Sequence, residues 1–191
     1  AGSQLTGRAS IGCWLSYGLG ADNYHVPTFI NKVKKNMGGQ PLYSRLWGNG
    51  FLPTEHQGVQ LRSGKDPVLY LTDPENYDGN DRRRMLDYLG KLNSIQNDAY
   101  GDPEINARMA QYEMAFRMQT SVPEVTDMSD EPDYIFDLYG SDSRDPGTYA
   151  ANCLMARKLL EKDVKFVQLY HQGWDQHAGC PEGVTAQCKR T

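Results

Sequence analysis

Two histidines and an aspartate follow one apolar run near the end of the chain, in the stretch KFVQLYHQGWDQHAGC at 165–180. The run stops at His171, and Asp175 and His177 come within the next six residues, in a protein with four histidines. Carboxylate oxygens and neutral imidazole nitrogens are ligands that zinc and similar divalent ions take. The spacing therefore indicates a loop that could hold one divalent metal ion, or share two.

An Asp-x-His triplet is also typical of a hydrogen-bonded turn, and a complete metal site needs a third or fourth ligand. The other two histidines, His25 and His56, lie far away in sequence and are interpreted as surface or structural residues. The cysteines lack zinc-ribbon spacing, and Cys180 and Cys188 could instead form a disulfide bond if the protein is exported. A metal site and a structural turn both remain possible interpretations of this loop.

The apolar run at 164–170 would position the loop that follows it. A helical pattern runs from about Pro146 to Lys162, with Asp145 as its cap, and a short turn leads to an apolar strand at 164–170. Such a helix and strand form half of a βαβ unit, which predicts a central, parallel strand. In open parallel sheets ligands bind beyond the carboxyl ends of strands, and His171 is the first residue past that end.

The fold class predicted for the whole chain is α/β, with a mainly parallel sheet in a single domain at 1–191. A short helix ends at Gly20 and a strand follows at 25–33. Insertions separate the strands. They are a loop-rich excursion at about 34–65, a strand at 68–71, a helical pair at 80–121 and an acidic loop after it.

Apolar spacing also predicts which faces of the three long helices are buried. The predicted sets are Met85, Leu89 and Leu92 in the first helix, Ile105, Met109, Tyr112 and Phe116 in the second, and Tyr149, Cys153, Ala156 and Leu160 in the third.

Composition argues against nucleic-acid binding and against a membrane-spanning helix. A net charge of -4 and a pI near 5.5 are not typical of nucleic-acid binding, which needs a basic face. No apolar stretch reaches the roughly 18 residues of a membrane helix, so no membrane span is predicted. No Gly-x-Ser-x-Gly elbow and no complete dinucleotide fingerprint occurs, which leaves the loop at 171–177 as the main candidate for chemistry.

Long segments of the chain carry a family resemblance. They are GRASIGCWLSYGLG, SRLWGNGFLPTEHQGVQLRSGKDPVLYL, RRRMLDYLGKLN, GDPEINARMAQYEMAFRMQTSVPE, DLYG, PGTYAANCLMARKLLEKDVKFVQLYHQGWDQH and QCK. With these segments the chain resembles a family of exported bacterial proteins known as domain of unknown function 1501, related to the sulfatase and alkaline phosphatase superfamily.

The resemblance implies an α/β/α sandwich of alkaline-phosphatase-like type, with a metal-binding edge at the strand ends. It also implies a twin-arginine export signal, a periplasmic or cell-envelope location, and further metal ligands and a nucleophile in segments before Ala1 and after Thr191. The chain is therefore expected to be an internal fragment of a longer domain. Two departures from relatives occur: Ala178-Gly179 replaces Gly-Asn, and Arg190 replaces Asp.

Together these observations give two hypotheses. The first is a metal-dependent hydrolase-like protein acting on small-molecule or polysaccharide esters of sulfate or phosphate. Asp175 and His177 would bind zinc, calcium or manganese, and His171 would be a ligand or stabilise the transition state. The second is a non-catalytic cell-envelope or polysaccharide-binding member, whose binding surface would be the aromatic stretch from Tyr43 to Phe51.

Overall fold

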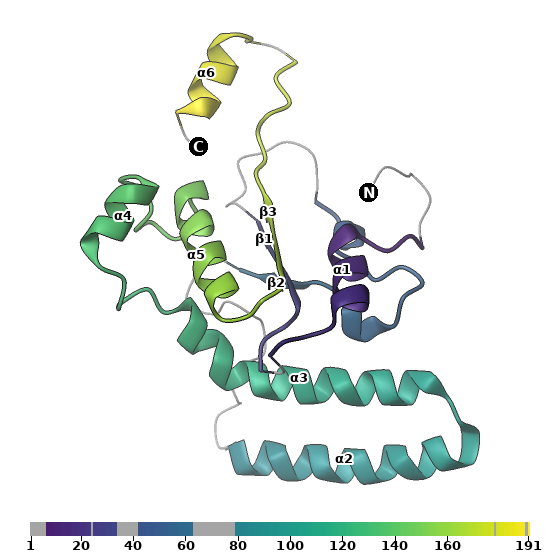
Figure 1. The fold of residues 1–191 in the computed structure, drawn as a ribbon. Coiled ribbons are helices and arrows are strands. Elements are labelled where there is room, and N and C mark those ends of the chain that lie inside the picture. The colour runs from purple at the N-terminus through teal and green to yellow at the C-terminus, as the bar shows by residue number, and fades with distance from the viewer. Residues whose placement is uncertain (1–6, 24, 34–41, 63–78, 178, 190) are drawn as a thin grey trace.

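The structure is a computed structural model that describes residues 7–23, 25–33, 42–62, 79–177, 179–189 and 191. Its elements run in the order α1 (Ile11–Leu19), β1 (Phe29–Val33), the 3-10 helices η1 (Ser44–Leu46) and η2 (Thr54–His56), β2 (Val59–Leu61), α2 (Gly79–Tyr100), α3 (Pro103–Thr126), α4 (Asp133–Tyr139), α5 (Tyr149–Glu161), β3 (Phe166–Tyr170) and α6 (Glu182–Cys188). Helices lie on both sides of a small sheet, which confirms the α/β class (Figure 1).

The sheet of the described residues has three strands in the order β2-β1-β3, and both pairings are parallel. Ile30 of β1 lies opposite Val59 on one side and Val167 on the other. The parallel strand predicted at 164–170 is thus confirmed. Its central position is wrong within the described sheet, because β1 lies in the middle and β3 at an edge. Edge strands lose one neighbour, and every residue of β3 is accordingly only half-buried.

The excursion at 34–65 differs from its prediction because it contains β2. Three residues between Gly58 and Arg62, with Gln60 in the middle, give too short an alternation to predict a strand. The part described is ordered, as expected, since Trp47 and Leu52 are buried. The strand predicted at 68–71 lies outside the described residues.

Side chains alternate across β1, so its two faces pack into different cores. Ile30 joins a cluster with the end of α3 and with α5, made of Val26, Leu61, Met118, Val122, Val125, Met155, Leu159 and Val164. Phe29 joins a second cluster with α1 and the excursion, made of Cys13, Trp47 and Leu52. The described residues therefore form three layers, with α1 on one face and α3 and α5 on the other (Figure 1).

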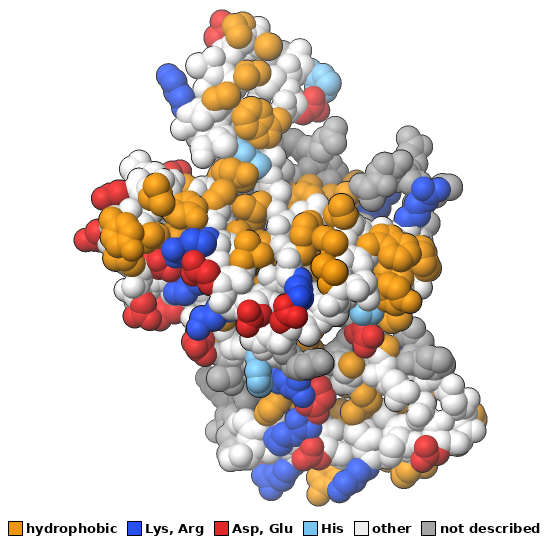
Figure 2. Space-filling view, viewed as in Figure 1, with side chains coloured by type: hydrophobic (Ala, Val, Ile, Leu, Met, Phe, Trp, Pro, Cys, Tyr) orange, Lys and Arg blue, Asp and Glu red, His pale blue; other side chains and the backbone are white. Residues whose placement is uncertain are grey.

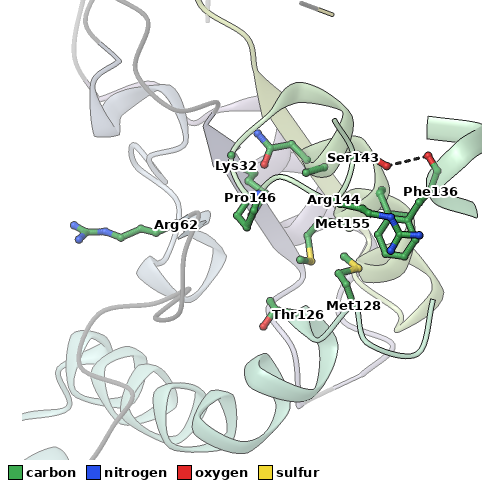
Figure 3. Close-up of a pocket in the computed structure, with 13 residues that line it drawn as sticks. Lys32, Arg62, Thr126, Met128, Phe136, Ser143, Arg144, Pro146 and Met155 are labelled. Carbon is green, nitrogen blue, oxygen red and sulfur yellow. Dashed lines mark hydrogen bonds between the residues drawn. The ribbon is translucent and has the colours of Figure 1, made fainter. Parts of the chain in front are cut away.

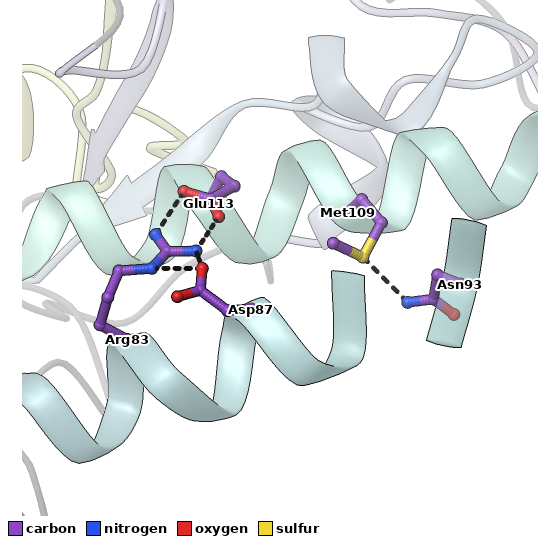
Figure 4. A network of polar contacts seen from close by, with 5 residues as sticks. All are labelled: Arg83, Asp87, Asn93, Met109 and Glu113. Atoms are coloured by element: carbon purple, nitrogen blue, oxygen red, sulfur yellow. Dashed lines mark hydrogen bonds and ion pairs between the residues drawn. The ribbon is translucent and has the colours of Figure 1, made fainter. Parts of the chain in front are cut away.

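Helices α2 and α3 form the expected pair, at 79–100 and 103–126 instead of 80–121. Arg83 of α2 donates to both carboxylate oxygens of Glu113 of α3, at 2.9 and 2.6 Å (Figure 4). The buried face predicted for α2 is wrong: Leu86 is buried, whereas Met85 and Leu92 are exposed. Since α2 packs mainly against α3, only the narrow side toward α3 is covered.

The acidic loop predicted after 120 is wrong at its start, because α3 continues through Pro123 to Thr126. A proline inside a helix costs roughly 3 kcal/mol. Burial of Val122 and Val125 in the core offsets this cost, which the local sequence does not reveal. The predicted stripe of α3 also differs, since Tyr112 is exposed and Met118 is buried.

Helix α5 begins at Tyr149, with Thr148 as its cap in place of Asp145. The Thr148 hydroxyl accepts a hydrogen bond from the backbone N–H of Ala151 at 3.1 Å. The predicted face is wrong by one residue, because Leu159 is buried and Leu160 exposed. Helices α4 and α6, of seven residues each, lacked a predicted counterpart.

Candidate functional site

His171 follows β3 directly, as predicted, and its ring is held on three sides. The indole N–H of Trp174 donates to Nδ1 at 3.3 Å, and the amide nitrogen of Gln187 lies 2.8 Å from Nε2. The phenol ring of Tyr149, in the first turn of α5, stacks on the imidazole with centroids 4.5 Å apart. The imidazole is thus fixed in orientation by the two helices that flank the loop, α5 and α6.

Gln187 fastens the loop to α6, and sequence reasoning missed it. Its side chain is buried and also donates to the backbone carbonyl of Gln172 at 3.0 Å. Gly173 turns with φ +96°, and a Cβ there would lie 2.9 Å from Oε1 of Gln187. The turn therefore needs glycine. Gln187 carried no signal in the sequence because α6 itself was not predicted.

Asp175 and His177 lie together, but their side chains are open to solvent. Oδ1 of Asp175 is 2.8 Å from Nε2 of His177, and the two side chains are 43% and 88% exposed. The structure thus pairs the two predicted metal ligands, whereas the His171 ring contacts Trp174, Gln187 and Tyr149. Among the described residues, no three His, Cys, Asp or Glu side chains gather where they could hold one metal ion.

The remaining histidines and cysteines have other surroundings. Nδ1 of His56 is 3.0 Å from the hydroxyl of buried Ser16, and the ring contacts Tyr17 edge-on. His56 therefore ties η2 to α1 and borders a groove of about 820 Å3 between these elements and α3. His25 is exposed. Cys180 and Cys188 are exposed free cysteines, so the disulfide bond considered between them is not formed.

Polar side chains within the strands were not predicted to matter. Gln60, Asn31 and Gln168 lie side by side across β2, β1 and β3. Neither amide atom of the fully buried Asn31 has a hydrogen-bond partner in the described part of the chain. The signal was one amide in the middle of each strand, and buried polar groups of this kind are normally satisfied.

Lys32 is the second overlooked residue of β1, and it faces the α5 side. It is buried, and its burial lowers the pKa of the amine from 10.5 to about 8. It borders a cavity of about 340 Å3, together with Met128 and Met155 (Figure 3). This cavity lies at the carboxyl half of β1, because Lys32 is the penultimate residue of that strand.

The relationship of the chain to known proteins follows from one match. A family model described as "Protein of unknown function (DUF1501)" matches residues 1–191. The chain belongs to the DUF1501 family. The resemblance to domain of unknown function 1501 is therefore confirmed. Searches of curated proteins and of solved structures each found no match to this DUF1501 chain.

A helix that crosses a membrane must be both long and apolar. In the described ranges of this DUF1501 chain, no helix is long and apolar enough to cross a bilayer. This agrees with the prediction that the sequence contains no membrane span.

Proposed function

We propose that this DUF1501 chain is part of a metal-dependent hydrolase-like protein of the sulfatase and alkaline phosphatase superfamily, which acts on phosphate or sulfate esters. The observation that carries the proposal is the Asp175–His177 pair, with 2.8 Å between Oδ1 and Nε2, in the loop that follows parallel strand β3. In open parallel α/β sheets this edge is where ligands bind. The same proposal includes export of this protein to the periplasm or cell envelope.

The donor set fits a divalent ion in part. Two atoms bound to tetrahedral zinc, each about 2 Å from it, lie about 3.3 Å apart. Oδ1 of Asp175 and Nε2 of His177, at 2.8 Å, need only a small rotation to reach that spacing. Asp175 and His177 would therefore hold zinc, calcium or manganese together with ligands from elsewhere. When bound, such an ion polarises an ester oxygen and offsets developing negative charge.

His171 supports this chemistry by its fixed position. A neutral imidazole can accept at one nitrogen while the other carries a proton. The stacked Tyr149 ring and the Gln187 contact hold the imidazole beside the loop. Because Nδ1 accepts from Trp174, the N–H of the neutral ring is at Nε2, where Gln187 lies. When the Gln187 side chain turns away from the ring, His171 would donate this N–H toward an ester oxygen and stabilise charge in the transition state. Trp174 at its edge would limit the access of water.

A second function, polysaccharide binding without catalysis, is favoured by one surface feature. Trp14, Tyr17 and Phe51 are exposed, and the Trp14 ring contacts the other two edge-on, with centroids 6.1 and 5.5 Å away. Figure 2 shows hydrophobic side chains gathered over α1 and the adjoining excursion. Aromatic rings with a polar edge suit surfaces that bind partly apolar partners. Tyr43 is also exposed, whereas Trp47 is buried.

Ester hydrolysis tests the first function. The full-length natural protein, supplied with zinc, manganese or calcium, should hydrolyse para-nitrophenyl phosphate or sulfate. Asp175→Ala with His177→Ala should reduce the rate at least about a hundredfold, because both ligands are removed. Release of para-nitrophenol measures the rate.

A matched pair controls for surface change. Asp98 on α2 and His25 are both exposed, so Asp98→Ala with His25→Ala should stay within about twofold of the natural protein. Equal rates for the two double variants would contradict the proposal. Retention on polysaccharide, abolished by Trp14→Ala with Phe51→Ala and without any hydrolysis, would favour the second function instead.

A further inference from the structure

The cavity beside Lys32 combines a buried lysine with a lining that, among the described residues, includes no carboxylate. The described residues that line it are Lys32, Arg62, Thr126, Met128, Phe136, Ser143, Arg144, Pro146, Gly147, Ala151, Asn152, Leu154 and Met155. Three are cations, and neither Asp nor Glu occurs among them. A buried ammonium group without a counter-charge is unfavourable, so a bound anion would offset a real cost.

The three cations are placed differently around this space. The guanidinium of Arg62 points away from the other labelled side chains (Figure 3). Arg144 stacks over the Phe136 ring at 3.9 Å and pairs with Asp133 outside the cavity. Lys32 is buried and, within the described residues, has no ion pair. Lys32 is therefore the cation that an occupant of the cavity would meet.

Asn152 supplies a second, independent observation. Its side chain is 1% exposed, lines the cavity, and has a carbonyl oxygen without a hydrogen-bond partner in the described part of the chain. Rotation of the amide exchanges its donor and its acceptor, so the group can offer an N–H to a ligand. A bound water or ion is one of the explanations of such an orphaned buried group.

The helix that carries Asn152 adds a third favourable contribution. Gly147, Ala151 and Asn152 line the cavity at the start of α5, a helix of 13 residues. The positive end of the helix dipole favours negative charge near the first turn. Thr148 already accepts from the N–H of Ala151, so the helix contributes its field more than free donors.

We propose that this cavity is a binding site for a small organic oxyanion, with the oxyanion beside Lys32 and Asn152 and an apolar part against Met128, Met155 and Phe136. The volume of about 340 Å3 lies at the small end of ligand pockets, which suits a metabolite-sized molecule. The site goes beyond the proposed function because it requires neither a metal ion nor the loop at 171–177.

Titration with simple oxyanions tests the site. The natural protein, stripped of divalent ions with EDTA and then dialysed free of the chelator, is titrated with inorganic phosphate, sulfate or acetate against sodium chloride of equal ionic strength. Saturable heat release or a saturable rise in melting temperature is expected with at least one of the three. Phosphate or sulfate indicates a phosphoryl or sulfuryl group in the natural ligand, and acetate indicates a carboxylate.

Variants assign the binding to the cavity. Lys32→Met should weaken it at least about tenfold, and Asn152→Leu several-fold, because charge and donor are lost. Lys189→Met, at an exposed lysine, should leave it unchanged and controls for net charge. The site is refuted if Lys32→Met binds as well as the natural protein, or if none of the three anions exceeds chloride. Since the divalent ions have been removed beforehand, a failed hydrolase proposal leaves this result unaffected.

Discussion

Replacing Lys32 by methionine is expected to stabilise the folded protein by about 3 kcal/mol at pH 7 in buffer without oxyanions, since each pKa unit corresponds to about 1.4 kcal/mol. Burial lowers the pKa of Lys32 from 10.5 to about 8, so the protonated amine is disfavoured in the folded state. Methionine has a similar length and no charge. It therefore keeps contacts with the cavity wall and removes the cost of burying the ammonium group.

The gain should depend on pH in a defined direction. Between pH 8 and 10.5 the unfolded chain keeps the proton that folded Lys32 has released, so the stability of the natural protein rises with pH. Below pH 8 the penalty is fully present. Urea unfolding at pH 7 and pH 10 measures it: the difference between the two proteins should shrink at pH 10. A methionine variant that is less stable at pH 7, or a difference independent of pH, would show that the folded state does not disfavour the ammonium group.

A methyl group added at Gly12 is expected to destabilise the fold by about 1 to 3 kcal/mol, the usual cost of overpacking a core. A Cβ at Gly12 would lie 2.5 Å from the ring of Phe29, which is 2% exposed. A Cβ added at Gly58 would also lie 2.5 Å from this ring, so the ring is closely packed at both glycines. Because Phe29 lies on the central strand, the strain would reach the sheet that positions the loop.

Gly18 provides a control within the same helix. A Cβ at Gly18 meets nothing within 4 Å, and alanine favours the helix by roughly 0.5 to 1 kcal/mol over glycine. Gly18→Ala should therefore raise the melting temperature, whereas Gly12→Ala lowers it. Thermal unfolding followed by circular dichroism measures both. If both changes shift the melting temperature upward, the close packing of α1 on Phe29 is wrong.

The sequence predicted the parts of the fold that local sequence patterns determine. Helix α1 ends at Gly20 as expected, and the run at 164–170 was long and apolar enough to identify β3. It did not predict β2 or the end of α3, because those depend on tertiary burial. Val122 and Val125 keep α3 helical past Pro123 only because they reach the core.

The candidate site likewise has some features that local sequence predicts and others that depend on tertiary packing. The position of His171 after β3, and the nearness of Asp175 to His177, follow from local sequence and were predicted. The roles of Tyr149 and Gln187 depend on where α5 and α6 pack, which spacing alone does not encode. The burial of Lys32 was not predicted, for a different reason. A lysine within a strand is usually exposed, and only the structure places its amine beside a cavity.

Metal content tests the central claim most directly. The full-length natural protein, purified without chelators, is compared with Asp175→Ala combined with His177→Ala, and with the control Asp98→Ala combined with His25→Ala. Mass spectrometry of the elements should find at least one zinc, manganese or calcium ion per chain in the natural protein and in the control, and a clear loss in the Asp175 and His177 variant. No stoichiometric metal in the natural protein, or equal metal in all three, would contradict the proposal that the loop at 171–177 is a metal site.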